Sequence, residues 1–179
     1  APTLPTTNTD HSEKMEKIAS FAVNHLVLEP GVYLSRRDVT PKGDVISTYD
    51  IRMTTPNREP ALEPQALHTI EHLAATWLRN HQVWGPRMVY WGPMGCCTGN
   101  YLILSGEYST REIAAVMLEM MDWIAAFDGE IPGATARDCG NYTFNNPEGA
   151  RAAAKKYADG TLRGITDDHL SYAEAGKGL

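Results

Sequence analysis

Apolar and polar residues alternate along residues 31–40 and 44–53, and these two segments meet at the turn sequence PKGD. A repeat of two residues is typical of a strand with one buried face, and the Pro/Gly-containing sequence between them favours a turn. The two segments are therefore predicted to form a β-hairpin. Residues 87–93 and 98–107 are predicted to be two further strands, joined by the glycine-containing turn GPMGCC.

A different period, of three to four residues, predicts helices further along the chain. Residues 65–81 have this pattern, and Pro64 lies where a helix commonly begins. Residues 111–127 form a second amphipathic segment, which Ser109 or Thr110 can cap.

A third helix is expected over residues 147–158, beginning at Pro147 and ending at Asp159-Gly160. A short helix is also expected over residues 13–22.

The domain organisation predicted from the chain is simple. Its 179 residues suffice for one compact core, and neither an internal repeat nor a linker divides them. Residues 1–18, rich in Thr, Pro and Asn, are predicted to be a disordered or extended leader. Residues 19–179 are predicted to form a single domain.

Composition excludes several classes of function. The net charge is −6 with no Lys/Arg cluster, so nucleic-acid binding is not expected. No apolar run is long enough to span a membrane, and the N-terminus lacks an apolar signal core. Three cysteines, two of them adjacent (Cys96, Cys97 and Cys139), make a poor disulfide framework. A reducing, cytoplasmic location is therefore predicted.

The string HTIEH, residues 68–72, carries the clearest chemical signal. On a helix that advances about 100° per residue, His68, Glu71 and His72 share one side. Two imidazoles one turn apart can bind one metal ion, and the carboxylate can act beside that ion as a base. This is the pattern of an open, catalytic metal site.

A catalytic metal usually takes a third protein ligand, and the cysteines are candidates. Cys139 lies in the loop DCGN, where it is either a ligand or a small buried residue. Cys96 lies in the turn between two predicted strands. This turn is either a simple glycine-rich turn or one that projects its side chains into a cleft. A thiol near a divalent ion has a lowered pKa and can move protons near neutral pH. We assign Cys97 no role.

Several blocks of this sequence together resemble one known family, that of S-ribosylhomocysteine lyase (LuxS, the autoinducer-2 synthase). These blocks are SFAVNH, GDVISTYDIRMTTPN, HTIEH, PMGCCTGNYLILSGE and CGNYTFNNPEGAR. The resemblance runs from about residue 19 to residue 156. It implies an α+β fold, in which an antiparallel β-sheet packs against helices, and a homodimer with active sites at the subunit interface.

The resemblance also implies the roles of particular residues. The metal ligands would be His68, His72 and Cys139. The metal would be Fe(II) in cells, with zinc or cobalt able to replace it.

Cys96 and Glu71 would be the acid–base pair of such an enzyme. Ser20, His25 and Arg52 would line the substrate pocket. The chain departs from the family pattern at Asn24, Tyr90, Trp91, Cys97 and Asn100, which are expected to affect the shape of that pocket.

The implied reaction cleaves the thioether of S-ribosylhomocysteine. Proton transfers would move the carbonyl along the ribose, and β-elimination would release homocysteine and 4,5-dihydroxy-2,3-pentanedione, the autoinducer-2 precursor. The metal would act as a Lewis acid.

Two other functions are compatible with the HTIEH helix. One is a zinc metallopeptidase of the HxxEH type, which needs an acidic third ligand such as Glu112 or Glu119. The other is a non-enzymatic domain with a structural His/His/Cys site, in which Cys96 would be the fourth ligand.

Overall fold

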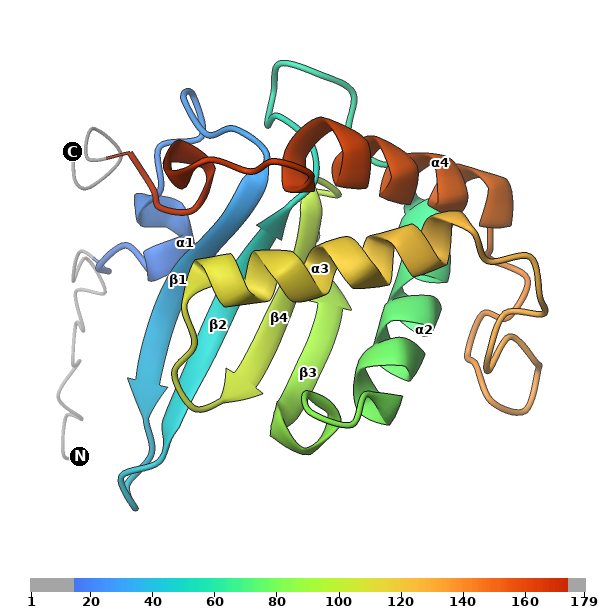
Figure 1. Ribbon diagram of the computed structural model, residues 1–179, viewed down its shortest axis with the longest axis horizontal. Coiled ribbons are helices and arrows are strands. Elements are labelled where there is room, and N and C mark those ends of the chain that lie inside the picture. Colours follow the sequence, from blue (N-terminus) through green and yellow to red (C-terminus); the bar gives the residue numbers. More distant parts are fainter. Residues whose placement is uncertain (1–14, 174–179) are drawn as a thin grey trace, which may run out of the picture.

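The computed structural model describes residues 15–173, and its centre is one four-stranded antiparallel sheet (Figure 1). The strands are β1 (Gly31–Val39), β2 (Val45–Arg52), β3 (Met88–Pro93) and β4 (Gly99–Ser105), in the spatial order β1-β2-β4-β3. Both predicted hairpins are confirmed. β4, and not β3, pairs with β2, and the long link from β2 to β3 contains a helix.

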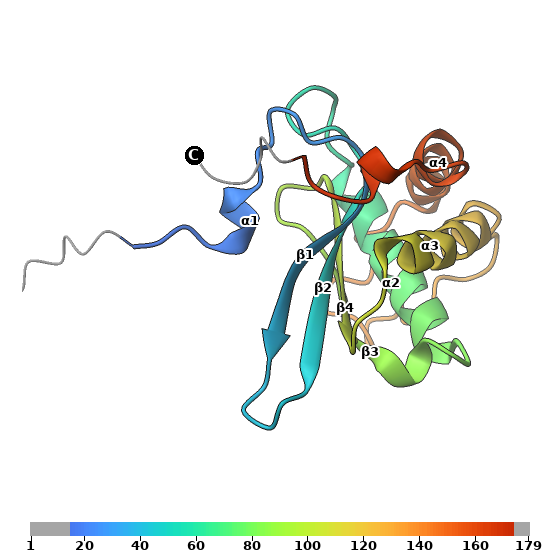
Figure 2. The ribbon, with the colours of Figure 1, turned by 60° about the vertical axis from the view of Figure 1, so that its left-hand side comes forward.

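Three long helices cover one face of this sheet, as Figure 2 shows. They are α2 (Pro64–Asn80), α3 (Thr110–Ala125) and α4 (Pro147–Tyr157). The short helix α1 (Ala19–Ala22) lies on the opposite side. The α+β fold predicted above is therefore confirmed.

Local capping fixes where the long helices begin. The Glu63 side chain accepts hydrogen bonds from the backbone N–H groups of Gln65 and Ala66 at the start of α2. At the start of α3, Ser109 and Glu112 form a reciprocal capping box. These caps satisfy N–H groups that lack partners within the helix.

The predicted helix over residues 13–22 was too long. Residues 15–18 have no regular secondary structure, and the helix is confined to Ala19–Ala22. Met15 is almost fully exposed, and a short helix without an apolar partner is marginal in water. Leader residues 1–14, and residues 174–179, lie outside the described part of the chain.

The third helix ends at Tyr157, one residue before its predicted end, but Asp159-Gly160 does not close it. Beyond α4 the chain continues as a π-helical turn, η2 (Ala158–Leu162), closed by a hydrogen bond from the Arg163 N–H to the Ala158 carbonyl. Gly164, with φ of +73°, takes the left-handed conformation that ends a helix, and Gly160 does not. Two other helical turns are η1 (Gly85–Arg87) and η3 (Asp167–His169).

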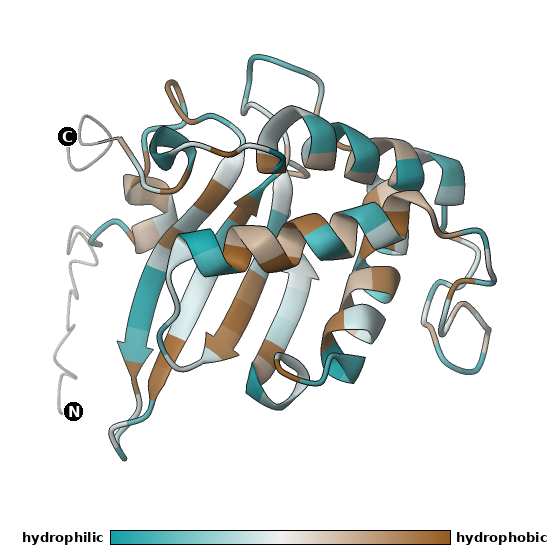
Figure 3. Ribbon diagram, in the orientation of Figure 1, coloured by the Kyte–Doolittle hydropathy of each residue, from teal (hydrophilic) through white to brown (hydrophobic). Residues whose placement is uncertain are grey.

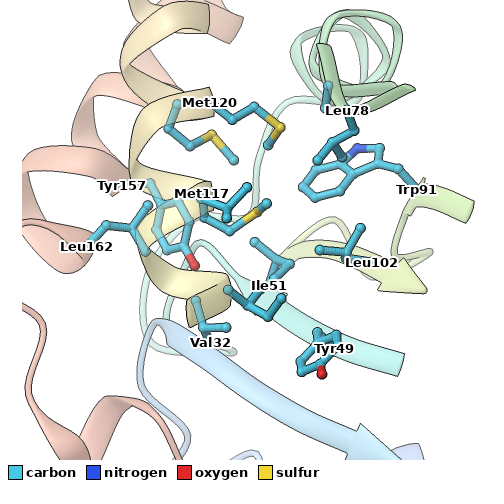
Figure 4. Packing of buried hydrophobic residues seen from close by; sticks show 14 of the residues in the cluster. Val32, Tyr49, Ile51, Leu78, Trp91, Leu102, Met117, Met120, Tyr157 and Leu162 are labelled. Atoms are coloured by element: carbon cyan, nitrogen blue, oxygen red, sulfur yellow. The ribbon is translucent and has the colours of Figure 1, made fainter. Parts of the chain in front are cut away.

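The hydrophobic core lies between the sheet and the three long helices. Met117, Met120 and Met121 of α3 are completely buried there, and Figure 4 shows Met117 and Met120 above Ile51 and Leu102 of the sheet. By contrast, the connection between α3 and α4 is mostly hydrophilic (Figure 3). In residues 15–173, no helix combines the length and apolar character needed to cross a membrane.

Candidate metal centre and thiol cluster

His68 and His72 lie one turn apart on α2, and both rings are half-buried. Nδ1 of His68 lies 2.5 Å from the carbonyl oxygen of Phe144, and Nδ1 of His72 lies 2.7 Å from that of Pro132. A carbonyl oxygen only accepts hydrogen bonds, so each Nδ1 carries the proton. In a neutral ring this arrangement leaves Nε2 unprotonated, the form that binds a metal.

The two unprotonated nitrogens face each other. The His68 and His72 Nε2 atoms are 3.2 Å apart, and two lone pairs cannot form a hydrogen bond with each other. The Cys139 Sγ lies 3.6 Å from the His68 Nε2. Tetrahedral coordination with ordinary zinc bond lengths needs an N···N separation of about 3.3 Å and an N···S separation of about 3.6 Å. The donor set thus fits a divalent metal ion.

The loop between α3 and α4 brings Cys139 to this helix. Within the loop, the Cys139 N–H donates to the Thr135 carbonyl, and the Asn141 N–H points to the Cys139 Sγ at 3.4 Å. Gly133, with φ of +70°, lies against the His72 ring, where a Cβ would approach Nδ1 to 3.3 Å. His68, His72 and Cys139, expected to be ligands, are therefore brought together, with all ligand atoms within 4.8 Å.

Glu71 lies half-buried on the same side of α2. It lines a pocket of 270 Å³ together with His68, Phe144 and the turn between β3 and β4. Of the two adjacent cysteines in that turn, Cys97 lines the pocket and Cys96 does not. Nothing in the sequence pattern favoured Cys97, whose backbone takes the left-handed conformation, with φ of +60°.

Cys96 belongs to a second cluster, centred on Arg52. Arg52 is buried and makes a bidentate ion pair with Asp50, at 3.0 Å from Nε to Oδ1 and 2.7 Å from Nη2 to Oδ2. Its Nη1 donates to the Thr98 hydroxyl at 2.8 Å, and that oxygen lies 3.1 Å from the Cys96 Sγ. The exposed thiol of Cys96 is thus linked through one hydroxyl to a buried guanidinium.

The charge of Arg52 is secure despite its burial. Burial works to lower the pKa of Arg52, but the Asp50 carboxylate outweighs this, and the pKa is raised. The guanidinium therefore stays protonated and places positive charge near Cys96. A cation near a thiol favours the thiolate.

The two remaining predicted pocket residues come from the chain before β1. Ser20, in α1, lines a pocket of 220 Å³ on the sheet face opposite the long helices, with Tyr90 and Tyr101. His25 is half-buried, and its Nδ1 bonds the Val23 carbonyl at 2.8 Å. The pocket of Ser20 shares no lining residue with the pocket beside His68.

The positions that depart from the family pattern fall into two groups. Tyr90 and Cys97 line the two pockets just described, and Asn24 lines a third, smaller one. Trp91 and Asn100 instead point into the core and are buried. The expectation that these two shape a pocket directly is not supported by their position.

The alternative functions are not favoured by this geometry. Glu112, a possible third ligand of a metallopeptidase, is engaged in capping α3. Among residues 15–173, the grouping of ligand atoms contains Cys139 and neither Cys96 nor an acidic residue.

The fold and the donor set define an α+β domain with three side chains that could hold a metal ion, the number of protein ligands typical of catalytic metal sites. Comparison with known proteins identifies the family: the model of S-ribosylhomocysteinase (LuxS) matches residues 18–168. The chain belongs to this family.

Relatives named S-ribosylhomocysteine lyase align along most of the chain. The protein from Clostridium acetobutylicum is 55% identical over 161 residues, covering 89% of this chain and 100% of the relative. That from Phocaeicola vulgatus is 49% identical over 88% of this chain and 98% of the relative. That from Borreliella burgdorferi is 43% identical, covering 88% and 99% respectively.

Proposed function

We propose that this protein is a metal-dependent lyase that cleaves the thioether of S-ribosylhomocysteine. The products are homocysteine and 4,5-dihydroxy-2,3-pentanedione, the autoinducer-2 precursor. The observation that carries the proposal is the convergence of two imidazole Nε2 atoms and one cysteine sulfur. Membership of the S-ribosylhomocysteinase family supports the choice of substrate.

His68, His72 and Cys139 hold the metal in this proposal, with Fe(II) as the ion in cells and zinc or cobalt as substitutes. When bound, the ion supplies Lewis-acid polarisation of a substrate oxygen. The carbonyls of Phe144 and Pro132 keep both imidazoles in the ligating tautomer.

The side chains around the metal move the protons. Cys96 acts as a thiolate base in the carbonyl migrations, supported by the Arg52 charge through Thr98. Glu71, on the helix of the two histidines, acts as the second acid–base group. Ser20 and His25 hold the polar end of the substrate.

Two surfaces must meet for these groups to act together. Cys96 and Ser20 do not line the pocket that holds His68 and Glu71 in a single chain. The side of the sheet away from the long helices also has exposed apolar residues, among them Phe21 at 69%. We therefore propose a cytoplasmic homodimer, in which each active site combines Cys96 of one chain with Glu71 of the other.

Incubation with S-ribosylhomocysteine, followed by detection of free homocysteine thiol, tests the activity. Cys96→Ala should keep its metal, measured by elemental analysis, and lose turnover. Cys97→Ala is the matched control, because it removes the neighbouring thiol but no proposed proton carrier. Full activity of Cys96→Ala would remove Cys96 from the mechanism, and His72→Ala with unchanged metal content would refute the ligand set.

Mixing two inactive variants tests the shared site. A heterodimer of Cys96→Ala and Glu71→Gln chains contains one site with both residues intact. After random subunit exchange, about a quarter of the wild-type sites should be restored. If the mixture stays inactive although mass spectrometry shows heterodimers, both residues act within one chain.

A further inference from the structure

The segment from the end of η3 onward lies at the edge of the sheet and is fixed there by several contacts. Nδ1 of His169 bonds the Pro30 carbonyl at 2.7 Å, and the Leu170 carbonyl accepts a hydrogen bond from the Thr110 hydroxyl. The ring of Tyr172 stacks on Tyr33 of β1, with centroids 4.7 Å apart and planes 12° apart. The family model ends at residue 168, so Tyr172 lies outside the matched region.

Tyr172 is the outer end of a continuous polar chain that reaches Cys96. Its hydroxyl donates to Asp50 Oδ2 at 2.7 Å, the same oxygen that accepts from Arg52 Nη2. Arg52 in turn donates to Thr98, which contacts the Cys96 Sγ. Asp50 and Arg52 are buried, so water does not compete effectively with these links.

The direction of donation along this chain is determined by the groups themselves. Burial, together with the Asp50 charge, raises the pKa of Tyr172 well above its ordinary value, so the phenol stays protonated and donates. Because Thr98 Oγ1 accepts from Arg52, its own proton is free to point at the Cys96 sulfur. A thiolate at Cys96 therefore receives a hydrogen bond from a hydroxyl that a cation polarises.

We propose that Tyr172 is a positioning residue for the Cys96 thiolate, acting through Asp50, Arg52 and Thr98. The inference rests on the proposed function in one respect, that Cys96 carries protons in the reaction. The Tyr172 hydroxyl withdraws negative charge from Asp50 and fixes the plane of the carboxylate. Arg52 then presents Nη1 to Thr98 in one orientation.

The charged and titratable groups around this chain act on one another. Arg52 on β2 and Tyr101 on β4 each interact electrostatically with Cys96, and Asp50 interacts with Arg52 and with the phenols of Tyr101, Tyr33 and Tyr172. Tyr101 and Tyr33 have raised pKa values, each first because of burial and then because of Asp50. Both remain neutral in the range where a thiol titrates, so they do not produce the change tested below.

Tyr172→Phe tests this role, since it keeps the ring that stacks on Tyr33 and removes only the hydroxyl. With metal-loaded protein, the rate of iodoacetamide alkylation of Cys96 is measured against pH, and tandem mass spectrometry separates Cys96 from Cys97. The alkylation midpoint should rise by about one pH unit, and kcat/KM at neutral pH should fall about tenfold. Thr98→Val, which breaks the chain next to the thiol, should shift the midpoint in the same direction.

Tyr33→Phe is the matched control. It removes the other hydroxyl of the stacked pair, which donates to the Glu29 carbonyl and not to Asp50. Its alkylation midpoint and kcat/KM should stay within about twofold of the wild type.

The outcomes separate this inference from the proposed function. If Tyr172→Phe lowers the melting temperature or activity without moving the alkylation midpoint, Tyr172 only fastens the C-terminal segment and the inference is overturned. A wild-type profile overturns it as well. If Cys96→Ala is inactive while Tyr172→Phe behaves like the wild type, only this inference is overturned. If Cys96→Ala is active, the proposed role of Cys96 is overturned.

Discussion

Thr69 joins α2 to the loop that supplies Cys139, and Thr69→Val should weaken metal binding without removing a ligand. The side chain is completely buried. Its hydroxyl accepts from the Asn146 N–H at 3.0 Å and donates toward Asn145 Oδ1 at 2.8 Å and the Gln65 carbonyl at 3.1 Å. Valine has nearly the same shape but satisfies none of these groups.

The size of the effect follows from these contacts. Leaving a buried N–H without a partner costs about 1–3 kcal/mol. The groups that would lose a hydrogen-bond partner belong to Asn145 and Asn146. These residues directly follow Phe144, whose carbonyl orients the His68 ring. If the cost falls on the closed form of the loop, metal affinity drops about tenfold for each 1.4 kcal/mol. The expected loss is therefore about 10–100-fold, the range seen for residues that orient metal ligands.

Competition between the protein and a chromophoric chelator for Co²⁺ measures this loss. The matched control is Thr69→Ser, which keeps the hydroxyl and removes a methyl group, so its affinity should stay close to the wild type. The reasoning fails if Thr69→Val binds Co²⁺ as tightly as Thr69→Ser, because the loop would then be held at the metal by other contacts.

Three further changes test the fold. Ile70→Ala, at a fully buried position of α2, should lower the free energy of unfolding by about 2–5 kcal/mol in urea titrations; less than 1 kcal/mol would contradict the packing. Burial opposes ionisation of Glu59, but hydrogen bonds from the Thr55 N–H and Lys156 outweigh burial and lower the pKa of Glu59. The charge of Glu59 therefore stabilises the fold above its unfolded pKa, and this contribution is lost as pH falls. Glu59→Gln should thus destabilise by about 0.5–1 kcal/mol at pH 7, a difference that shrinks as pH falls through the lowered pKa of Glu59; a difference that is independent of pH would refute it. Gly99→Ala should disrupt the β2–β4 pairing beside Arg52, since its Cβ would collide with a β2 carbonyl, and wild-type thermal stability would show that the strands can separate there.

The strands and long helices could be predicted from the sequence because their signals are local. Residues 44–53 alternate, residues 65–81 repeat every three to four positions, and Ser109 precedes its helix with the expected cap. The approach of Cys139 to His68 is a long-range contact that spacing cannot give. The residues alone left Cys139 as either a ligand or a buried residue, the family resemblance implied the ligand, and the structure brings Cys139 and His68 together.

The unpredicted features depend on contacts between distant segments or on backbone conformation. The orientation of Cys97 follows from a positive φ, which cannot be predicted from a cysteine in the sequence. The contact of Tyr172 with Asp50 joins parts of the chain with no shared motif. One signal was present: Asp50 and Arg52, two residues apart on a strand, must lie on the same face, and this predicts their ion pair.

The loop between α3 and α4 supplies both the Cys139 sulfur and the two carbonyls that hold the histidine rings. The same loop thus provides one proposed metal ligand and the carbonyls that orient the other two. Release of the ion and detachment of this loop from α2 should then be a single cooperative event. Chelation of the metal ion would expose this loop to proteases. Metal supply would then govern the lifetime of the protein as well as its activity.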